Sequence, residues 1–235
     1  MDGRGGADLP RVIDATYTCE HTITTVCKSR SGSEYTCKQT EAADPMQRAL
    51  WYTLVCTGVR RGEACGLRWR DVDLRGAVAS VTNALVLVDN RAVDSSPKTK
   101  SSRRVVPLAS QVVAVLKEWR AEQDRQRDRV GDAWHGDYVF TWQDGSPIRP
   151  DYVTKEFRRA VKLAGLPTIR LHDLRHGYAT LSLQAGVHPK VVADGLGHRS
   201  TEVTMDTYSH VIPAVQREAT ELVADAIFGG KSGGS

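Results

Sequence analysis

The feature that most constrains the fold is a change in apolar periodicity between residues 76 and 108. On both sides of this stretch, apolar residues recur with the 3.6-residue spacing of buried helix faces, as in the segment that begins near residue 44. Inside it, valines gather in short β-rich runs around a turn-forming stretch at residues 96–102. The pattern predicts an α+β fold that is mainly α, with a small antiparallel β-sheet.

Helices are expected over most of the remaining chain. Asp44 is a good helix cap and Pro45 suits a first turn, which predicts a buried helix from there to Thr57. The other predicted helices cover residues near 20–28, a short stretch ending at 67, 110–129, 151–164, 172–185, 189–196, 201–210 and 213–228. Within the β-rich stretch we expect Lys98 at the tip of a hairpin, where a side chain can reach a ligand.

The composition is that of an ordinary soluble protein. Of 235 residues, 40% are hydrophobic and 26% are charged, which is enough for a sizeable core. No run approaches the ~18 apolar residues of a membrane span, and the first ten residues lack the apolar stretch of a signal peptide. The net charge of +4 is compatible with a polyanionic partner. We expect a cytoplasmic protein, with a flexible lead-in at residues 1–10 and a Gly/Ser tail at 229–235.

The cysteines do not indicate a disulfide framework. There are five, all in the first third of the chain, and none forms a C-x-x-C pair. A zinc site made of Cys19, His21, Cys27 and Cys37 is conceivable, but its spacing fits no common zinc pattern. Reduced thiols are the better interpretation, and we predict neither a metal nor a cofactor.

The segment HDLRH carries His172, Arg175 and His176 on one helical face. The two histidines have the i, i+4 spacing of a metal pair, but no third ligand is obvious and a guanidinium between them opposes a cation. A phosphate is the favoured ligand, because an arginine can offer a bidentate fork to two of its oxygens. A surface cluster without function is the alternative.

Four further residues indicate chemistry only in combination. The phenol of Tyr208 is about 0.1% ionised at pH 7, so it needs nearby cations and a proton acceptor to attack a phosphodiester. Taken singly, Tyr208 is a packing residue, Lys98 an exposed lysine and His198 a structural histidine. Arg60 can pair with Glu63, three residues on, and Glu63 can orient it toward a phosphate.

The order of these residues along the chain resembles that of a known family. The segments TGVRRGEACGLRWRDVDL, PKTKSSRRVVPL, LHDLRHGYATL and LGHRSTEVTMDTYSHV follow one another as they do in the tyrosine recombinases of the phage integrase family. The resemblance covers about residues 44–213 and implies that family's catalytic domain over residues 11–228. The site it implies consists of Arg60, Lys98, His172, Arg175, His198 and Tyr208.

The resemblance also implies a mechanism. Tyr208 would attack the scissile phosphate and become linked to the DNA 3′-phosphate, and the 5′-hydroxyl of a partner strand would reseal it without ATP or metal. Arg60 and Arg175 would hold the phosphate with help from His198, Lys98 would act as general acid, and His172 would handle the tyrosine proton.

The implied partner is a double-stranded DNA attachment site, bound by a homotetramer of chains that are monomers in free solution. The family's N-terminal core-binding domain is expected to be absent, because the stretch before Asp44 is too short for it, so DNA affinity should be weak and salt-sensitive. Two alternatives remain at this point: a type IB topoisomerase, which shares the catalytic residues, and a DNA-binding module that does not cleave.

Overall fold

The computed structural model describes residues 21–28, 34–41, 44–95 and 103–198, together with residues 220 and 223. Its helices are α2 (Pro45–Thr57), α3 (Arg61–Cys65), α4 (Ser110–Val130), α5 (Pro150–Leu163), α6 (Leu171–Gln184) and α7 (Pro189–Leu196), with short 3₁₀ turns η2 (Trp69–Asp71) and η4 (Gly131–Ala133). The strands are β1 (His21–Lys28), β2 (Glu34–Glu41), β3 (Val72–Asp73), β4 (Val78–Val81), β5 (Ala84–Val88), β6 (Arg91–Ser95) and β7 (Arg104–Pro107).

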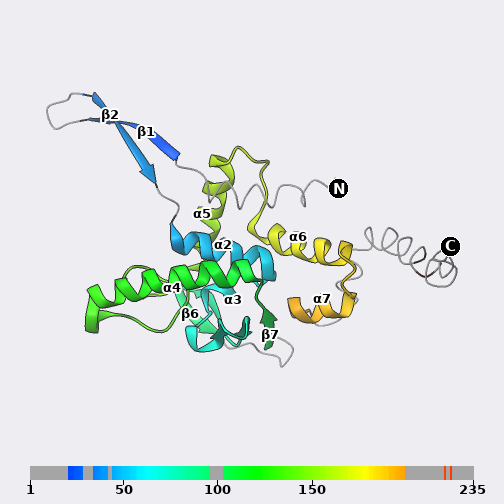
Figure 1. Ribbon diagram of the computed structural model, residues 1–235. Helices are drawn as coiled ribbons and strands as arrows, with labels where there is room; N and C mark the ends of the chain where they lie inside the picture. Colours follow the sequence, from blue (N-terminus) through cyan, green and yellow to red (C-terminus); the bar gives the residue numbers. More distant parts are fainter. Residues whose placement is uncertain are drawn as a thin grey trace, which may run out of the picture.

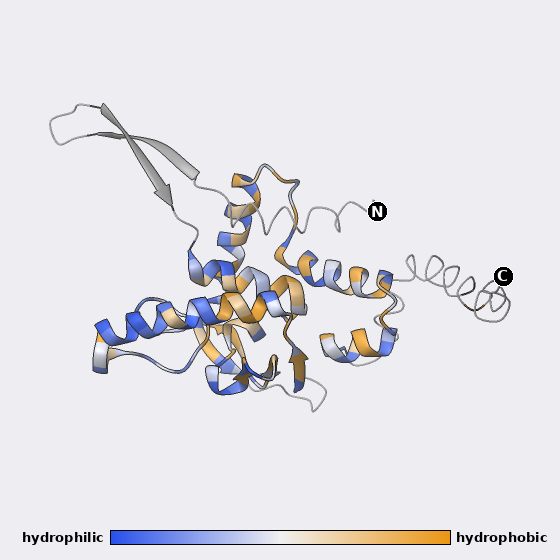
Figure 2. Cartoon of the chain, in the orientation of Figure 1, coloured by the Kyte–Doolittle hydropathy of each residue, from blue (hydrophilic) through white to orange (hydrophobic). Residues whose placement is uncertain are grey.

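Helix α2 forms the centre of the core and lies beside α4 (Figure 1). Its buried Trp51 meets Phe157 of α5 edge to face, with ring centroids 5.7 Å apart. Val112 and Leu116 of α4 are fully buried against the same cluster. Figure 2 shows that the far end of α4 is hydrophilic, as expected for its charged stretch after Trp119. The predicted helices at 45–57 and 189–196 are confirmed, and those near 110, 151 and 172 are confirmed to within a few residues.

The β-rich stretch forms two sheets. One is three-stranded in the order β3-β4-β7, and the other is the hairpin β5-β6; both are antiparallel. Ala79 and Val106 pair in register and face the core, which fixes the position of β7. Lys98 lies outside the described residues, but the strands that flank it pair with different partners. The prediction of a hairpin between those strands is therefore wrong.

The predicted helix near residues 20–28 is also wrong. This stretch is strand β1, paired antiparallel with β2 in the register His21↔Glu41 to Lys28↔Glu34. The reason lies in residues 22–26, where β-branched threonine, isoleucine and valine follow one another. Such side chains are stiff at χ1 and favour a strand over a helix.

A smaller apolar cluster joins α6 to α7, made of Ala179, Leu183, Val192 and Leu196 with Tyr178 packed against it. Because it fixes α7 on α6, it also fixes the turn that follows α7. The predicted helices at 201–210 and 213–228 lie outside the described residues, apart from helical positions 220 and 223. Within the described ranges, no helix combines the length and the apolar character needed to cross a membrane.

Candidate active site

Four of the six predicted site residues are described, and the fold brings them together from three separate parts of the chain. Arg60 lies between α2 and α3, His172 and Arg175 lie in the first turns of α6, and His198 follows α7. Arg60, His172 and Arg175 line one pocket of about 420 Å³, and His198 is close enough to Arg60 and Arg175 to be influenced by their charges. Lys98 and Tyr208 lie outside the described residues, so their positions remain predictions.

The pocket is strongly cationic. Its lining includes five arginines and one histidine and, among the described residues, no carboxylate: Arg60, Arg61, Arg158, Arg170, His172 and Arg175. Buried Leu54, Val59 and Leu174 also line it. A hollow lined by several arginine side chains suits an anionic ligand such as a phosphodiester.

Arg60 is held at the N-terminus of α3 by Glu63. The Arg60 backbone N–H donates to Glu63 Oε2 at 2.8 Å, and Nη1 of the same arginine donates to Oε1 at 2.8 Å. Arg60 Nη2 also donates to the carbonyl of Gly197 at 3.1 Å. The Arg60 side chain is 44% exposed, so it is both oriented and accessible, as the sequence predicted for the pair with Glu63.

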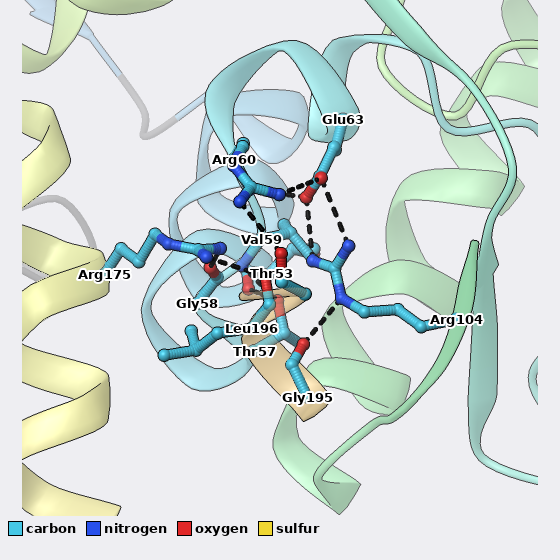
Figure 3. Close-up of polar contacts among 11 residues, drawn as sticks. Thr53, Thr57, Gly58, Val59, Arg60, Glu63, Arg104, Arg175, Gly195 and Leu196 are labelled. Carbon is cyan, nitrogen blue, oxygen red and sulfur yellow. Dashed lines mark hydrogen bonds and ion pairs between the residues drawn. The ribbon is translucent and has the colours of Figure 1, made fainter. Parts of the chain in front are cut away.

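Arg175 is buried and ties together the two backbone segments on either side of the site (Figure 3). Its Nη1 donates to the carbonyl of Gly58 at 2.7 Å and its Nη2 to that of Leu196 at 2.6 Å. Gly58 ends α2 in the left-handed conformation, with φ of +62°, where a side chain is strained. A Cβ there would also lie 2.7 Å from both Leu196 Cδ2 and Tyr178 Cδ1, so only glycine fits.

Arg104 belongs to the same cluster, although we did not predict it. Its Nη1 and Nη2 donate to Glu63 Oε1 at 3.1 Å and Oε2 at 2.8 Å, and its Nε donates to the carbonyl of Gly195 at 2.6 Å. The side chains of Arg104 and Glu63 are each only 7% exposed. Burial acts to raise the pKa of Glu63, but the hydrogen bonds and charge of Arg104, and then those of Arg60, hold that pKa below its usual range. Glu63 is therefore a carboxylate at neutral pH.

Both site histidines are shifted toward the neutral form. Desolvation, with the charges of His176 and Arg175, lowers the pKa of His172, whose ring meets that of His176 at 88° with centroids 4.7 Å apart. Desolvation, followed by the charges of Arg175 and Arg60, lowers the pKa of His198 to about 4. At pH 7 His172 can accept a proton, and His198 can donate one N–H hydrogen bond. Within the described ranges, no three His, Cys, Asp or Glu side chains are placed to hold a metal ion.

Comparison with known proteins identifies the family. Residues 34–214 match the phage integrase family. The chain belongs to this family. It is 32% identical over 191 residues to a tyrosine recombinase XerC-like protein of Caldanaerobacter subterraneus subsp. tengcongensis, covering 76% of this chain and 49% of that protein. It is 31% identical over 186 residues to the ICEBs1 integrase of Bacillus subtilis, covering 78% and 50%.

The solved structures confirm the predicted fold of this integrase-family chain. Its structure resembles that of the Tn1549 transposon integrase in complex with transposon right end DNA, with a TM-score of 0.63 and 25% identity, covering 75% of this chain and 58% of that chain. The chain spans about half the length of the curated relatives it matches. The predicted resemblance to tyrosine recombinases is thus confirmed at the level of family and fold.

A signal for Arg104 was present in the sequence of this integrase-family chain. Residues two apart in a strand share a face, so one of the two arginines before Val105 and Val106 was expected to share a buried face. The structure buries Val106 and exposes Val105, which places Arg104 on the inner face, where an arginine requires an acidic partner. What the sequence could not indicate was which acid, because Glu63 lies 41 positions away.

Proposed function

We propose that this chain is the catalytic domain of a site-specific DNA recombinase, in which Tyr208 forms a 3′-phosphotyrosyl link with DNA. The observation that carries the proposal is the convergence of Arg60, His172, Arg175 and His198 on one cationic site. The family supports it, since its members include named recombinases and integrases. DNA as the partner is supported by the Tn1549 integrase, which is similar in fold and was solved with DNA.

In the first step the Tyr208 oxygen attacks the scissile phosphorus and the bond from phosphorus to the DNA 5′-oxygen breaks. The phenol proton passes to His172, whose lowered pKa keeps it able to accept. Lys98 gives a proton to the departing 5′-oxygen, which leaves as a hydroxyl. The 5′-hydroxyl of a partner strand then gives its proton to Lys98 and attacks the phosphotyrosine. The bond from phosphorus to the Tyr208 oxygen breaks, that oxygen takes its proton back from His172, and the DNA is resealed. Because the bond energy is kept in the phosphotyrosine, the exchange requires neither ATP nor metal.

Positive charge around the phosphate favours the five-coordinate transition state, which carries more negative charge than the ground state. Arg60 contributes an accessible guanidinium already oriented by Glu63. Arg175 is 5% exposed and donates to two backbone carbonyls. It therefore adds positive charge to the pocket and holds together the backbone segments on either side of it. Each preorganised donor of this kind is commonly worth about 3 kcal/mol. His198 adds a neutral N–H donor.

The pocket offers further cations to a DNA strand that continues past the scissile phosphate. Arg61, which donates to Thr154 of α5, lines the same pocket as Arg60, and so do Arg158 and Arg170. Contacts from such side chains to the backbone would set the register of the DNA without reading its sequence. We propose that the chain is a monomer in solution and assembles as a homotetramer on two DNA attachment sites. The catalytic domain that takes part in this assembly covers residues 11–228.

The test is covalent capture. The chain is incubated with a pool of nicked duplexes of random sequence, in which the short cleaved product diffuses away, and protein-linked DNA is isolated under denaturing conditions and sequenced. We expect an adduct at the 3′-phosphate that is recovered on a recurring site and is unaffected by EDTA. Tyr208→Phe should abolish it, and Arg60→Gln should slow it on the order of 100-fold.

The possible outcomes separate the candidate functions. An adduct that survives Tyr208→Phe would show that the nucleophile is wrong, and inhibition by EDTA would overturn the metal-free mechanism. Relaxation of supercoiled DNA without a recurring site would favour a type IB topoisomerase. If the chain binds DNA but no adduct forms on any nicked duplex, it is a DNA-binding module that does not cleave.

A further inference from the structure

Three consecutive carbonyls at the end of α7 each accept a hydrogen bond from a different arginine, and Figure 3 labels the first two, Gly195 and Leu196. Gly195 accepts from Arg104 Nε at 2.6 Å, Leu196 from Arg175 Nη2 at 2.6 Å, and Gly197 from Arg60 Nη2 at 3.1 Å. The arginines come from β7, from α6 and from the junction before α3. The end of α7 is thus the place where three distant parts of the chain are joined.

The backbone of α7 explains why these carbonyls are available. The last carbonyls of a helix have no partner within it and form the negative end of its dipole. Here the N–H groups of Gly197 and His198 turn back to the carbonyls of Asp194 and Ala193, both at 3.0 Å. The next three carbonyls are left pointing outward, and guanidinium groups are well suited to them because each carries several N–H donors and a positive charge.

Arg104 differs from the other two arginines in where its side chain faces. Arg60 and Arg175 line the pocket that we propose for the phosphate, whereas Arg104 does not. The Arg104 side chain is 7% exposed and lies between the Glu63 carboxylate and the Gly195 carbonyl. Glu63 in turn shares its two oxygens between Arg104 and Arg60. Arg104 therefore contacts the partner of one catalytic group and the helix end that precedes another.

We propose that Arg104 is a positioning residue that fixes Arg60 and His198 relative to each other before DNA arrives. It donates to both oxygens of the Glu63 carboxylate that also binds Arg60, and it donates to the carbonyl of Gly195, three residues before His198. One carboxylate between two guanidinium groups also leaves a net positive charge, so Glu63 orients Arg60 without cancelling the charge available to a phosphate. The catalytic consequence of this inference rests on the proposed function, and the placement of His198 does not.

The first test is the rate of covalent adduct formation at saturating DNA in a single turnover. Arg104→Gln and Arg104→Lys should both slow it on the order of 100-fold, because a small misplacement of reacting groups is costly, while the Kd for DNA stays near that of wild type. Lysine keeps the charge but cannot reproduce the fork to Glu63 together with the bond to Gly195. The matched control is Arg103→Gln, which removes the same charge from the exposed neighbouring position and should leave the single-turnover rate unchanged.

The proposal would be overturned if Arg104→Gln or Arg104→Lys formed the adduct at the wild-type single-turnover rate. Thermal unfolding must show that each variant is folded at the assay temperature. If the single variants do not fold, the double variant Glu63→Gln/Arg104→Gln removes both buried charges and leaves neither unpaired. Its rate must still fall, and a wild-type rate would reject the positioning role.

The second test does not depend on cleavage. The pKa of the His198 ring is measured by NMR in wild type and in Arg104→Lys without DNA. Desolvation and the charges of Arg175, Arg60, His176 and Arg104 keep this pKa at about 4. In Arg104→Lys the charge remains, so a rise toward 6.5 would report that the end of α7 has loosened. An unchanged pKa would refute the positioning role. If wild type forms no adduct while His198 shifts as expected, it is the proposed function that fails.

Discussion

Helices α3 and α6 begin in the same way, yet among the described residues only the start of α3 holds a partner from elsewhere in the chain. Each has an arginine at the N-cap and an acid three residues later, and in each the N-cap N–H donates to the acid at 2.8 Å. Glu63 is 7% exposed and binds a second arginine from β7. Asp173 is 33% exposed and pairs with Arg170, which is itself 79% exposed. The local motif is the same, and its surroundings are not.

The difference shows that a capping motif by itself starts a helix and does no more. At α6 the Arg170–Asp173 pair is solvated and its hydrogen bonds compete with water, so its net worth is small. At α3 the Arg60 side chain is still 44% exposed, but the Glu63 carboxylate is only 7% exposed and is held by Arg104 of β7. With little water near Glu63, each hydrogen bond to it contributes more to stability. Because Glu63 is buried, this helix start also orients Arg60, the arginine that we propose for the phosphate.

The largest expected effect comes from removing the charge of the buried acid. Glu63→Gln leaves the buried Arg104 without a counter-charge, and breaking a buried ion pair costs about 3–5 kcal/mol. We expect that loss in the free energy of unfolding from urea titration followed by circular dichroism. A loss below about 1 kcal/mol would mean that water reaches the Glu63 cluster and that α3 and α6 do not differ as described.

The turns that precede the two helices offer a second comparison. Gly58, two residues before the Arg60 cap, has φ of +62° and no room for a Cβ, whereas Gly165, in the turn after α5, has φ of +63° and nothing within 4 Å. Alanine at either position should cost about 1–2 kcal/mol for the left-handed backbone. Gly58→Ala should cost more, because it also displaces Leu196 and Tyr178. Equal losses in urea unfolding would show that the junction before α3 is not tightly packed.

The contacts around α3 and α6 show which features could be predicted from the sequence and which could not. Local patterns were sufficient for the helix that starts after Asp44, for α7, and for the pairing of Arg60 with Glu63, because caps and i, i+3 neighbours lie within one turn. The order of motifs indicated the family and, through it, the candidate residues. The contact of Glu63 with Arg104 and the three carbonyls of α7 depend on which elements meet in space. No periodicity within a single segment encodes that.

The next largest effect concerns how the free energy of unfolding changes with pH, which should differ between Glu63 and Asp173. Burial acts to raise both pKa values, but Arg104 and Arg60 outweigh it at Glu63 and Arg170 outweighs it at Asp173, so both lie below their usual values. A carboxyl with a lowered folded pKa stabilises the fold above its unfolded value, 4.5 for Glu and 3.8 for Asp, and that contribution is lost as pH falls through the folded pKa. Urea unfolding between about pH 6 and pH 3 should show a shallower acid slope in Glu63→Gln and a nearly unchanged one in Asp173→Asn. The reverse ranking would contradict the assigned burial.

The smallest effect is expected at the start of α6. Asp173→Asn keeps an oxygen that can accept the Arg170 N–H and removes only an ion pair whose arginine is 79% exposed, so the cost should be about 0.5 kcal/mol. This variant also tests function at close range, because position 173 adjoins His172. The Asp173 carboxylate acts to raise the pKa of His172, so its removal should lower the apparent pKa of the pH–rate profile, while the rate at neutral pH stays near that of wild type. An unchanged profile would show that the Asp173 charge does not reach His172 and that this acid only starts the helix.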